Sequence, residues 1–197
     1  ALVISMQGID SCQLMAGEHI VIIGAGAIGL LAGMGALAYD AVPIIVDVGD
    51  ERLELARSYG IPYTVNPAKE NAVERVMEIT KGRGAECCME ASGSDAGVRS
   101  TLDYAAYTGR IALTGWPKHE ITLPTNLITK KELQVRGSRN GAGEFDEAID
   151  LIYTGKVPAE KIISKVVPYA ELPHMLGELS ERPGDYLKVV GLFHTEG

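Results

Sequence analysis

Residues 19–47 read HIVIIGAGAIGLLAGMGALAYDAVPIIVD, and this stretch decides the fold. An apolar run of strand length leads into three glycines at GxGxxG spacing, and a helical segment rich in Ala, Gly and Leu follows. A second apolar run ends in Asp47, which follows Gly24 by 23 residues. In a dinucleotide site an acid lies about 20 residues after the glycines. The order of these parts therefore predicts a βαβ unit that binds a dinucleotide.

The three glycines have different physical roles in such a turn. Gly24 permits the tight turn, Gly26 lets the backbone approach a pyrophosphate, and Gly29 lets helix and strand pack closely. The helix that begins around Ala27 and Ile28 directs its free N–H groups and its positive dipole end toward the anion. A glycine-rich turn alone is weak evidence, because it can simply be a turn. The ordered strand, turn, helix, strand and acid favour the cofactor interpretation.

Asp47 indicates which cofactor the turn would bind. Its carboxylate can accept two hydrogen bonds from ribose hydroxyls and would repel a 2′-phosphate, which favours NAD over NADP. The alternative is a carboxylate that forms or caps a turn.

Length, charge and cysteine usage exclude several classes of function. The 197 residues suffice for one large domain, or one and a half, with a sizeable core. The net charge is −8 and no Lys/Arg stripe is clustered, so the chain is a poor candidate for binding nucleic acid or an anionic membrane. No apolar run approaches the roughly 18 residues of a membrane span. Three cysteines give no disulfide framework, which predicts a reducing cytoplasm. The start, without Met or basic leader, is expected to be a cut inside a longer protein.

Strands and helices alternate through residue 115. We expect strands at 19–23, 43–46, 63–65, 86–91 and 110–114, and helices at 28–39, 51–59, 69–80 and 95–105. Such alternation predicts an α/β fold, a Rossmann-type doubly wound parallel sheet flanked by helices. Further elements are expected at 133–137, 143–154, 162–167, 170–181 and 186–193. Ligands of such sheets bind beyond the carboxyl ends of the strands, so the glycines and the acid converge on one crevice.

Several motifs, in order along nearly the whole chain, resemble the zinc-type medium-chain alcohol and polyol dehydrogenases. They are GAGAIGLL (24–31), VDVGDERLELA (46–56), KGRGAECCMEASGS (81–94), GRIALTGWP (109–117), ELQVRGSRNG (132–141), FDEAIDLIYTGKV (145–157) and YLKVVGLF (186–193). Within that family the chain is most similar to sorbitol, threonine and sugar-acid dehydrogenases. One departure is Ala27, where the family often has proline.

The resemblance implies further contacts with the cofactor. Arg52 matches an arginine that flanks the adenosine, with an ion pair to Glu51 or another acid as an equal alternative. Ser92 falls at the wall of the adenine pocket. Lys188 matches a basic residue that can reach the pyrophosphate, although a solvated strand lysine is the favoured interpretation. The residues implied beside the nicotinamide are Thr114, Gly115, Trp116, Ser138, Arg139 and Asn140.

The resemblance also implies a catalytic part outside this chain. Family members are roughly twice as long and carry most catalytic zinc ligands in an N-terminal barrel-like domain. Residues 1–138 would form the dinucleotide-binding domain, and residues 139–197 the helices and strand that pack on the missing domain. In the complete enzyme zinc would act as a Lewis acid on the substrate alkoxide while hydride passes to NAD. The chain itself would bind NAD(H), contain no catalytic residue, and not turn over.

A zinc site within this chain is not expected. Its cysteines and histidines show no CxxC or HxxxH spacing. Cys87 and Cys88 fall in a buried strand, where adjacent side chains point to opposite faces and cannot easily share one metal.

The function indicated is hydride transfer between NAD and a secondary alcohol, such as a polyol, a sugar acid or an amino alcohol. A dinucleotide-sensing regulatory module and an S-adenosylmethionine-binding methyltransferase also use a glycine turn followed by an acid. The motifs past residue 105 argue against the first, and the three-glycine spacing argues against the second. A small-molecule alcohol or polyol is the expected partner, with a homodimer or homotetramer formed through the edge of the sixth strand. The residues that select the substrate lie in the missing domain.

Overall fold

The computed structural model describes residues 1–141, 143, 145–182 and 184–193. The chain forms two compact units, Ala1–Val157 and Pro158–Gly197. Among the described residues, the first unit holds a helix-flanked parallel sheet. The second holds a pair of strands, one α-helix and two short 3-10 helices, η1 (Ala159–Ile162) and η2 (Tyr169–Glu171). The boundary expected at residues 138 and 139 is not tested by this division and stays a prediction.

The described part of the first unit is built on six strands in the order β3-β2-β1-β4-β5-β6. All neighbouring pairs in this sheet are parallel. The strand order changes direction between β1 and β4, which is the topological switch point of a doubly wound sheet. The expected Rossmann-type fold is therefore confirmed. The strands are β1 (His19–Ile23), β2 (Val42–Val46), β3 (Tyr63–Val65), β4 (Ala85–Glu90), β5 (Ala105–Leu113) and β6 (Gln134–Gly137).

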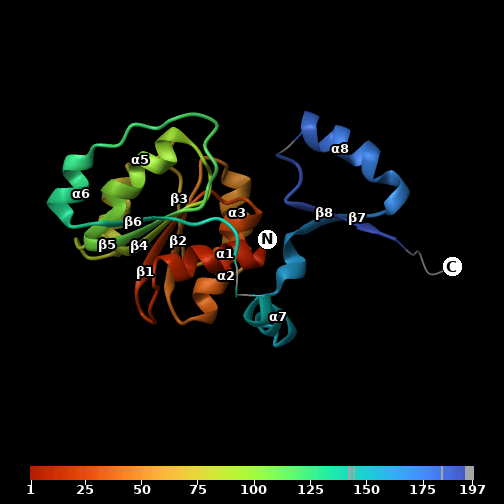
Figure 1. Cartoon of the computed structure of the whole chain (residues 1–197), viewed down its shortest axis with the longest axis horizontal. Helices are drawn as coiled ribbons and strands as arrows, with labels where there is room; N and C mark the ends of the chain where they lie inside the picture. Colours follow the sequence, from red (N-terminus) through yellow and green to blue (C-terminus); the bar gives the residue numbers. More distant parts are fainter. Residues whose placement is uncertain (142, 144, 183, 194–197) are drawn as a thin grey trace. The chain divides into compact units, whose positions relative to one another are not determined.

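Helices cover both faces of the sheet, with α1 and α2 on one side and α5 on the other (Figure 1). The helices of this unit are α1 (Leu2–Ser11), α2 (Ala27–Ala38), α3 (Asp50–Ser58), α4 (Ala72–Ile79), α5 (Asp95–Tyr104), α6 (Thr125–Lys131) and α7 (Phe145–Tyr153). The sequence did not predict α6, because its seven residues carry no helical pattern of apolar side chains. Tertiary contacts hold it instead, since Lys131 donates hydrogen bonds to the carbonyls of Leu102, Asp103 and Ala105 at the end of α5.

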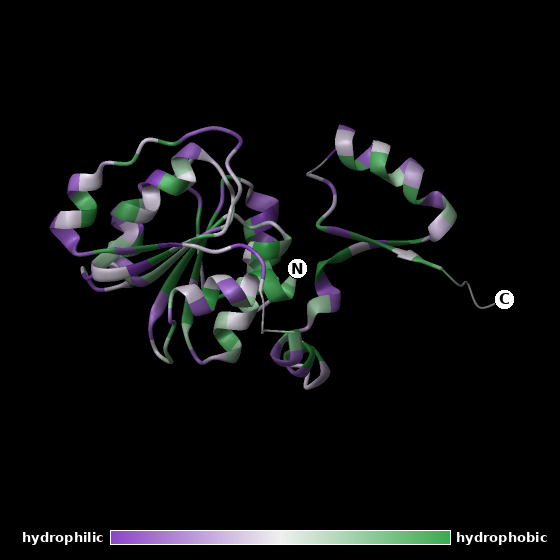
Figure 2. Ribbon diagram, viewed as in Figure 1, coloured by the Kyte–Doolittle hydropathy of each residue, from purple (hydrophilic) through white to green (hydrophobic). Residues whose placement is uncertain are grey.

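Burial on both faces explains why the strands read as continuous apolar runs. Figure 2 shows hydrophobic residues along the interior strands. Val21 and Ile44 belong to a core shared with α4 and α5. On the opposite face α2 lies close to the sheet, because a Cβ on Gly33 would be 3.1 Å from the Cδ1 of Ile45.

The second unit is small and keeps apolar side chains exposed. Its strands β7 (Ile163–Pro168) and β8 (Lys188–Leu192) pair in parallel, and α8 (Leu172–Glu181) connects them. Two strands alone are marginally stable in water. Leu176 and Phe193 are mostly exposed. In neither unit does any described helix combine the length and the apolar character needed to cross a bilayer.

Candidate functional site

The glycine turn lies at the carboxyl end of β1, beside the end of β2. Gly24 has φ +103°, a conformation that side-chain-bearing residues rarely adopt. Its N–H donates to the carbonyl of Val46 at 2.8 Å. A Cβ on Gly24 would also lie 3.2 Å from the backbone nitrogen of Ser92. Both the backbone angle and the space therefore require glycine at this position.

The other two glycines of the motif occupy opposite environments. A Cβ on Gly29 would lie 1.8 Å from the carbonyl oxygen of Gly24, so the first turn of α2 packs directly on the glycine turn. A Cβ on Gly26 would meet no protein atom within 4 Å. Gly26 is the N-cap of α2, and no side chain caps this helix. The space in front of the helix N-terminus is therefore open to an anion, whose oxygens would accept the first N–H groups.

Asp47 ties the glycine turn to the loop after β2. One carboxylate oxygen accepts a hydrogen bond from the N–H of Ala25 at 2.7 Å, and the other accepts from the N–H of Gly49 at 2.8 Å. The hydrogen bond from Gly49 gives Asp47 the turn-forming role that was named above as the alternative to ribose binding. Each oxygen retains a lone pair, so these bonds leave the carboxylate able to accept from a ligand hydroxyl.

A pocket of about 200 Å³ opens beside Asp47 and the glycine turn. It is smaller than the roughly 300–1,000 Å³ that encloses a drug-sized ligand, so it suits one ring system of a larger molecule. The pocket is lined by Ile23, Gly24, Val46, Asp47, Val48, Pro67, Ser92, Ser94, Ala96, Gly97, Ser100 and Tyr104.

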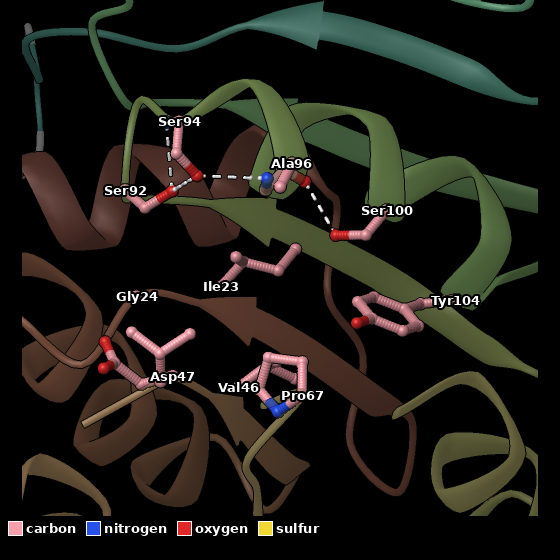
Figure 3. A pocket seen from close by; sticks show the side chains of 12 residues that line it. Ile23, Gly24, Val46, Asp47, Pro67, Ser92, Ser94, Ala96, Ser100 and Tyr104 are labelled. Atoms are coloured by element: carbon pink, nitrogen blue, oxygen red, sulfur yellow. Dashed lines mark hydrogen bonds between the residues drawn. The ribbon is translucent and has the colours of Figure 1, made fainter. Parts of the chain in front are cut away.

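The two walls of the pocket differ in chemistry (Figure 3). Val46 and Pro67 form an apolar wall, and the hydroxyls of Ser92, Ser94 and Ser100 line the opposite one. An apolar slot with hydroxyls along one side is suited to a flat heteroaromatic ring with polar edges.

Three pocket residues were predicted from the sequence as cofactor contacts: Gly24, Asp47 and Ser92. The others were missed. Val48 follows Asp47 directly, and Pro67 comes shortly after the carboxyl end of β3. Because ligands bind at the carboxyl ends of the strands, these positions could have been predicted as part of the site. Tyr104 had no such signal, because it ends α5 and reaches the pocket only through the packing of that helix on the sheet.

The residues implied beside the nicotinamide lie in the loops after β5 and β6. The N–H groups of Thr114 and Gly115 donate to the carbonyl of Glu90, each at 2.9 Å. The guanidinium of Arg139 lies 3.8 Å from the centre of the Trp116 ring, which is 73% exposed.

Two hydroxyls in these loops are buried without a hydrogen-bond partner in the part of the chain that the structure describes. They belong to Thr114 and Ser138. Asn140, in the second loop, is exposed. These residues follow neighbouring strands, so the structure brings them to the same edge of the sheet as the glycine turn.

Arg52 and Lys188 are placed differently. Arg52 lies on the first turns of α3, with its Cγ 3.4 Å from the position of a Cβ on Gly49. Its stem therefore lies next to the Asp47 loop. Lys188 begins β8 in the second unit and is exposed, so the structure does not place it relative to the glycine turn.

The residues that the structure describes do not fit a zinc ion. Within residues 1–141, 143, 145–182 and 184–193, no group of three His, Cys, Asp or Glu side chains is arranged to hold a metal. Cys87 contacts the carbonyl of Cys12 on the α1 side of the sheet, with its sulfur at 3.4 Å. Cys88 belongs to the core on the α5 side. Of the four histidines in the sequence, His194 lies outside the described residues.

The buried thiols of β4 are expected to resist alkylation while the chain is folded. A hydrogen bond with Cys12 and burial raise the pKa of the Cys87 thiol, and burial raises the pKa of the Cys88 thiol. Because the thiolate is the nucleophile, a raised pKa lowers the reactive fraction at neutral pH. Iodoacetamide labelling read by mass spectrometry should modify both residues in urea and neither in buffer. Rapid labelling of Cys88 in buffer would contradict its placement in the core.

Comparison with known proteins agrees with this geometry. The profile of a family described as "Zinc-binding dehydrogenase" matches residues 27–154. An "uncharacterized zinc-type alcohol dehydrogenase-like protein" of Haemophilus influenzae is 52% identical over 192 residues, which cover 98% of this chain and 56% of that protein. D-xylulose reductase A of Aspergillus oryzae is 30% identical over 197 residues, which cover 97% of this chain and 55% of the reductase.

A solved structure shows the same arrangement. Alcohol dehydrogenase TADH from Thermus sp. ATN1 superimposes with a TM-score of 0.90 at 29% identity, covering 98% of this chain and 56% of that enzyme. The chain therefore spans about half the length of the curated relatives and of the solved structure that it matches.

Proposed function

The chain belongs to the zinc-binding dehydrogenase family, and from this premise we propose that it is the NAD-binding part of an oxidoreductase that acts on a secondary alcohol. The observation that supports this most strongly is the convergence at one sheet edge. The open N-terminus of α2 at Gly26, the Asp47 carboxylate and the apolar pocket lie next to one another. They match the pyrophosphate, the adenosine ribose and the adenine of a dinucleotide in order.

Each part of the cofactor has a proposed partner. The first N–H groups of α2, from Ala27, Ile28 and Gly29, would donate to the pyrophosphate. Val48 and Ser92, which both line the pocket, would enclose the adenine, with Arg52 beside the adenosine. When bound, the nicotinamide ring accepts the hydride. The proposed contacts on the nicotinamide side are Thr114, Gly115, Trp116, Ser138, Arg139 and Asn140, and Lys188 would reach the pyrophosphate.

The fixed orientation of Asp47 supports NAD as the cofactor rather than NADP. Two backbone N–H groups hold its carboxylate at the mouth of the pocket. A 2′-phosphate there would meet a negative charge that cannot turn away without losing both hydrogen bonds. Ribose hydroxyls, in contrast, would donate to its remaining lone pairs.

We assign the substrate site and the catalytic machinery to the part of the longer relatives that this chain does not span. A relative named as a xylulose reductase supports a polyol or a similar secondary alcohol as the substrate class. The exposed apolar side chains of α7, such as Ile149 and Tyr153, suit a surface covered by a further domain. We place the zinc ligands there as well, and assign residues 139–197 to packing against it.

Two other features, the edge strand β6 and the free cysteines, support a proposed oligomeric state and a proposed cellular compartment. The edge of β6 (Gln134–Gly137) borders the sheet and could pair with the same strand of a second copy, giving a homodimer or a tetramer. Free buried cysteines suit a reducing cytoplasm.

Calorimetric titration of the chain with NAD, NADP and S-adenosylmethionine tests the proposal. NAD is expected to bind, NADP to bind more weakly, and S-adenosylmethionine not to bind. Preferential binding of S-adenosylmethionine would support a methyltransferase instead. A second assay adds alcohols and polyols with NAD and follows NADH absorbance. No turnover is expected, and substantial NADH production would show that the chain carries its own catalytic residues.

A further inference from the structure

Glu90 is a fully buried carboxylate at the carboxyl end of a central strand. It ends β4, which lies between β1 and β5, and its exposed fraction is 0%. Removing an isolated carboxylate from water is costly, so such a side chain requires hydrogen bonds or opposite charge nearby. The groups that donate hydrogen bonds to the Glu90 carboxylate are therefore the groups whose positions Glu90 fixes.

The loop that follows β4 supplies donors to the side chain. Glu90 Oε1 accepts hydrogen bonds from the N–H of Ser92 at 2.8 Å, from the N–H of Gly93 at 3.0 Å, and from the Ser92 hydroxyl. The N–H of Gly93 also lies 3.1 Å from Oε2. The first turn of α5 is adjacent, because a Cβ on Gly97 would lie 2.9 Å from Oε1, and the positive end of that helix favours an anion.

The main chain of Glu90 holds the neighbouring loop. Its carbonyl accepts the N–H groups of Thr114 and Gly115. A Cβ on Gly115 would lie 2.3 Å from Glu90 Oε2, so this glycine packs directly on the carboxylate. Gly93 in turn lies against the backbone of Trp116, where a Cβ would approach the carbonyl oxygen to 3.0 Å. One residue therefore joins the loop after β4 to the loop after β5.

We propose that Glu90 is a positioning residue for the cofactor, which holds the adenine-side and nicotinamide-side loops in one geometry without touching NAD. The inference rests on the proposed function, which places Ser92 beside the adenine and Trp116 beside the nicotinamide. A dinucleotide that spans both loops binds more tightly when they are already ordered, because ordering them on binding subtracts from the affinity. A buried carboxylate is suited to this role, since no water replaces its bonds when the loops shift.

The isosteric variant Glu90→Gln removes the negative charge of the side chain but keeps its size and shape. It keeps one acceptor oxygen, but its NH₂ group must face either the donors at Oε1 or the N–H of Gly93 at Oε2. The loops should stay folded but lose their fixed geometry. We expect the affinity for NADH to fall roughly tenfold, the effect of disturbing hydrogen bonds to a charged group. Glu90→Ala should weaken binding further.

Thr80→Val is the matched control. Thr80 is also fully buried, and its hydroxyl accepts the N–H of Gly84 at 3.0 Å near the opposite end of β4. The substitution removes a buried hydrogen bond far from the cofactor loops along the strand. It should lower the melting temperature but leave the dissociation constant of NADH unchanged.

Trp116 is the single tryptophan of the chain, so energy transfer from its emission to bound NADH reports the position of the nicotinamide-side loop. Glu90→Gln should raise the dissociation constant and change the transfer at saturating NADH, whereas Thr80→Val should change neither. If Glu90→Gln loses only thermal stability, as the control does, Glu90 is merely structural and the inference is overturned. If the unmodified chain does not bind NADH, the proposed function fails first.

Hydrogen exchange in the unmodified chain tests the same point without any variant. The amides of Ser92, Gly93, Thr114 and Gly115 should be protected before NADH is added, because Glu90 already accepts from them. Protection that develops only with NADH would mean that the cofactor, rather than Glu90, orders the loops.

Discussion

Gly29→Ala is expected to lower the free energy of unfolding by about 3 kcal/mol or more and to abolish NAD binding. The new Cβ would lie 1.8 Å from the carbonyl oxygen of Gly24. Both clashing groups are held by backbone, so no change of rotamer relieves the overlap. Either the start of α2 or the glycine turn must move, and the proposed pyrophosphate site moves with it. Urea unfolding followed by circular dichroism measures the stability, and calorimetry measures the binding.

Gly26→Ala is the matched control in the same turn. Its φ of −77° is ordinary for alanine, and a Cβ there meets no protein atom within 4 Å. Its stability should stay within about 0.5 kcal/mol of the unmodified chain. NAD binding should nevertheless fall at least roughly tenfold, because the methyl group occupies the space proposed for the pyrophosphate. Unchanged NAD affinity in Gly26→Ala would show that the pyrophosphate lies elsewhere.

Asp47→Ser should weaken NAD binding by about 1–3 kcal/mol, through the loss of hydrogen bonds to the ribose. The substitution should also destabilise the fold by about 1–2 kcal/mol, since the carboxylate accepts the N–H groups of Ala25 and Gly49. The preference for NAD over NADP should narrow, because the charge that opposes a 2′-phosphate is removed. Calorimetry with both cofactors and urea unfolding measure the three effects.

Asp50→Ser is the matched control for Asp47→Ser, because it removes one negative charge at a neighbouring position in the sequence. Asp50 is exposed and pairs with Lys69 and Asn66 outside the pocket lining, so its loss should leave cofactor selectivity unchanged. If Asp47→Ser binds NAD as well as the unmodified chain while NADP binding stays absent, Asp47 does not contact the ribose. If the preference for NAD over NADP narrows in both variants, the cause is the net charge near the site and not a specific contact of Asp47.

Local patterns predicted most of the first unit because its strands are buried on both faces. A strand covered by helices on each side reads as an unbroken apolar run, as in β1 and β2. The need for glycine at position 24 was likewise predictable, since a turn with φ near +100° excludes most side chains. In contrast, α6 carries no such pattern, because Lys131 binds carbonyls 26–29 residues away in the sequence.

The candidate site divides in the same way. Part of the site could be recognised from the spacing of residues within one short stretch, 24–47. These residues are Gly24, Gly26, Gly29 and Asp47. Tyr104 and Glu90 could not be recognised in this way, because one reaches the pocket from the far end of a helix and the other acts through loops that follow two different strands. Their positions depend on which strands are neighbours, and this is a property of the sheet rather than of any one segment.

The sequence by itself determined the alternating α/β class, the glycine turn and the acid opposite it, because those features depend on backbone conformation and on residues close along the chain. Only the tertiary structure decided that Gly29 packs on a carbonyl while Gly26 faces open space, although both are glycines of one motif. It also decided that a carboxylate inside an apolar strand holds two loops together. The physical reason is that burial and hydrogen-bond partners are set by the packing of distant segments, which no local pattern encodes.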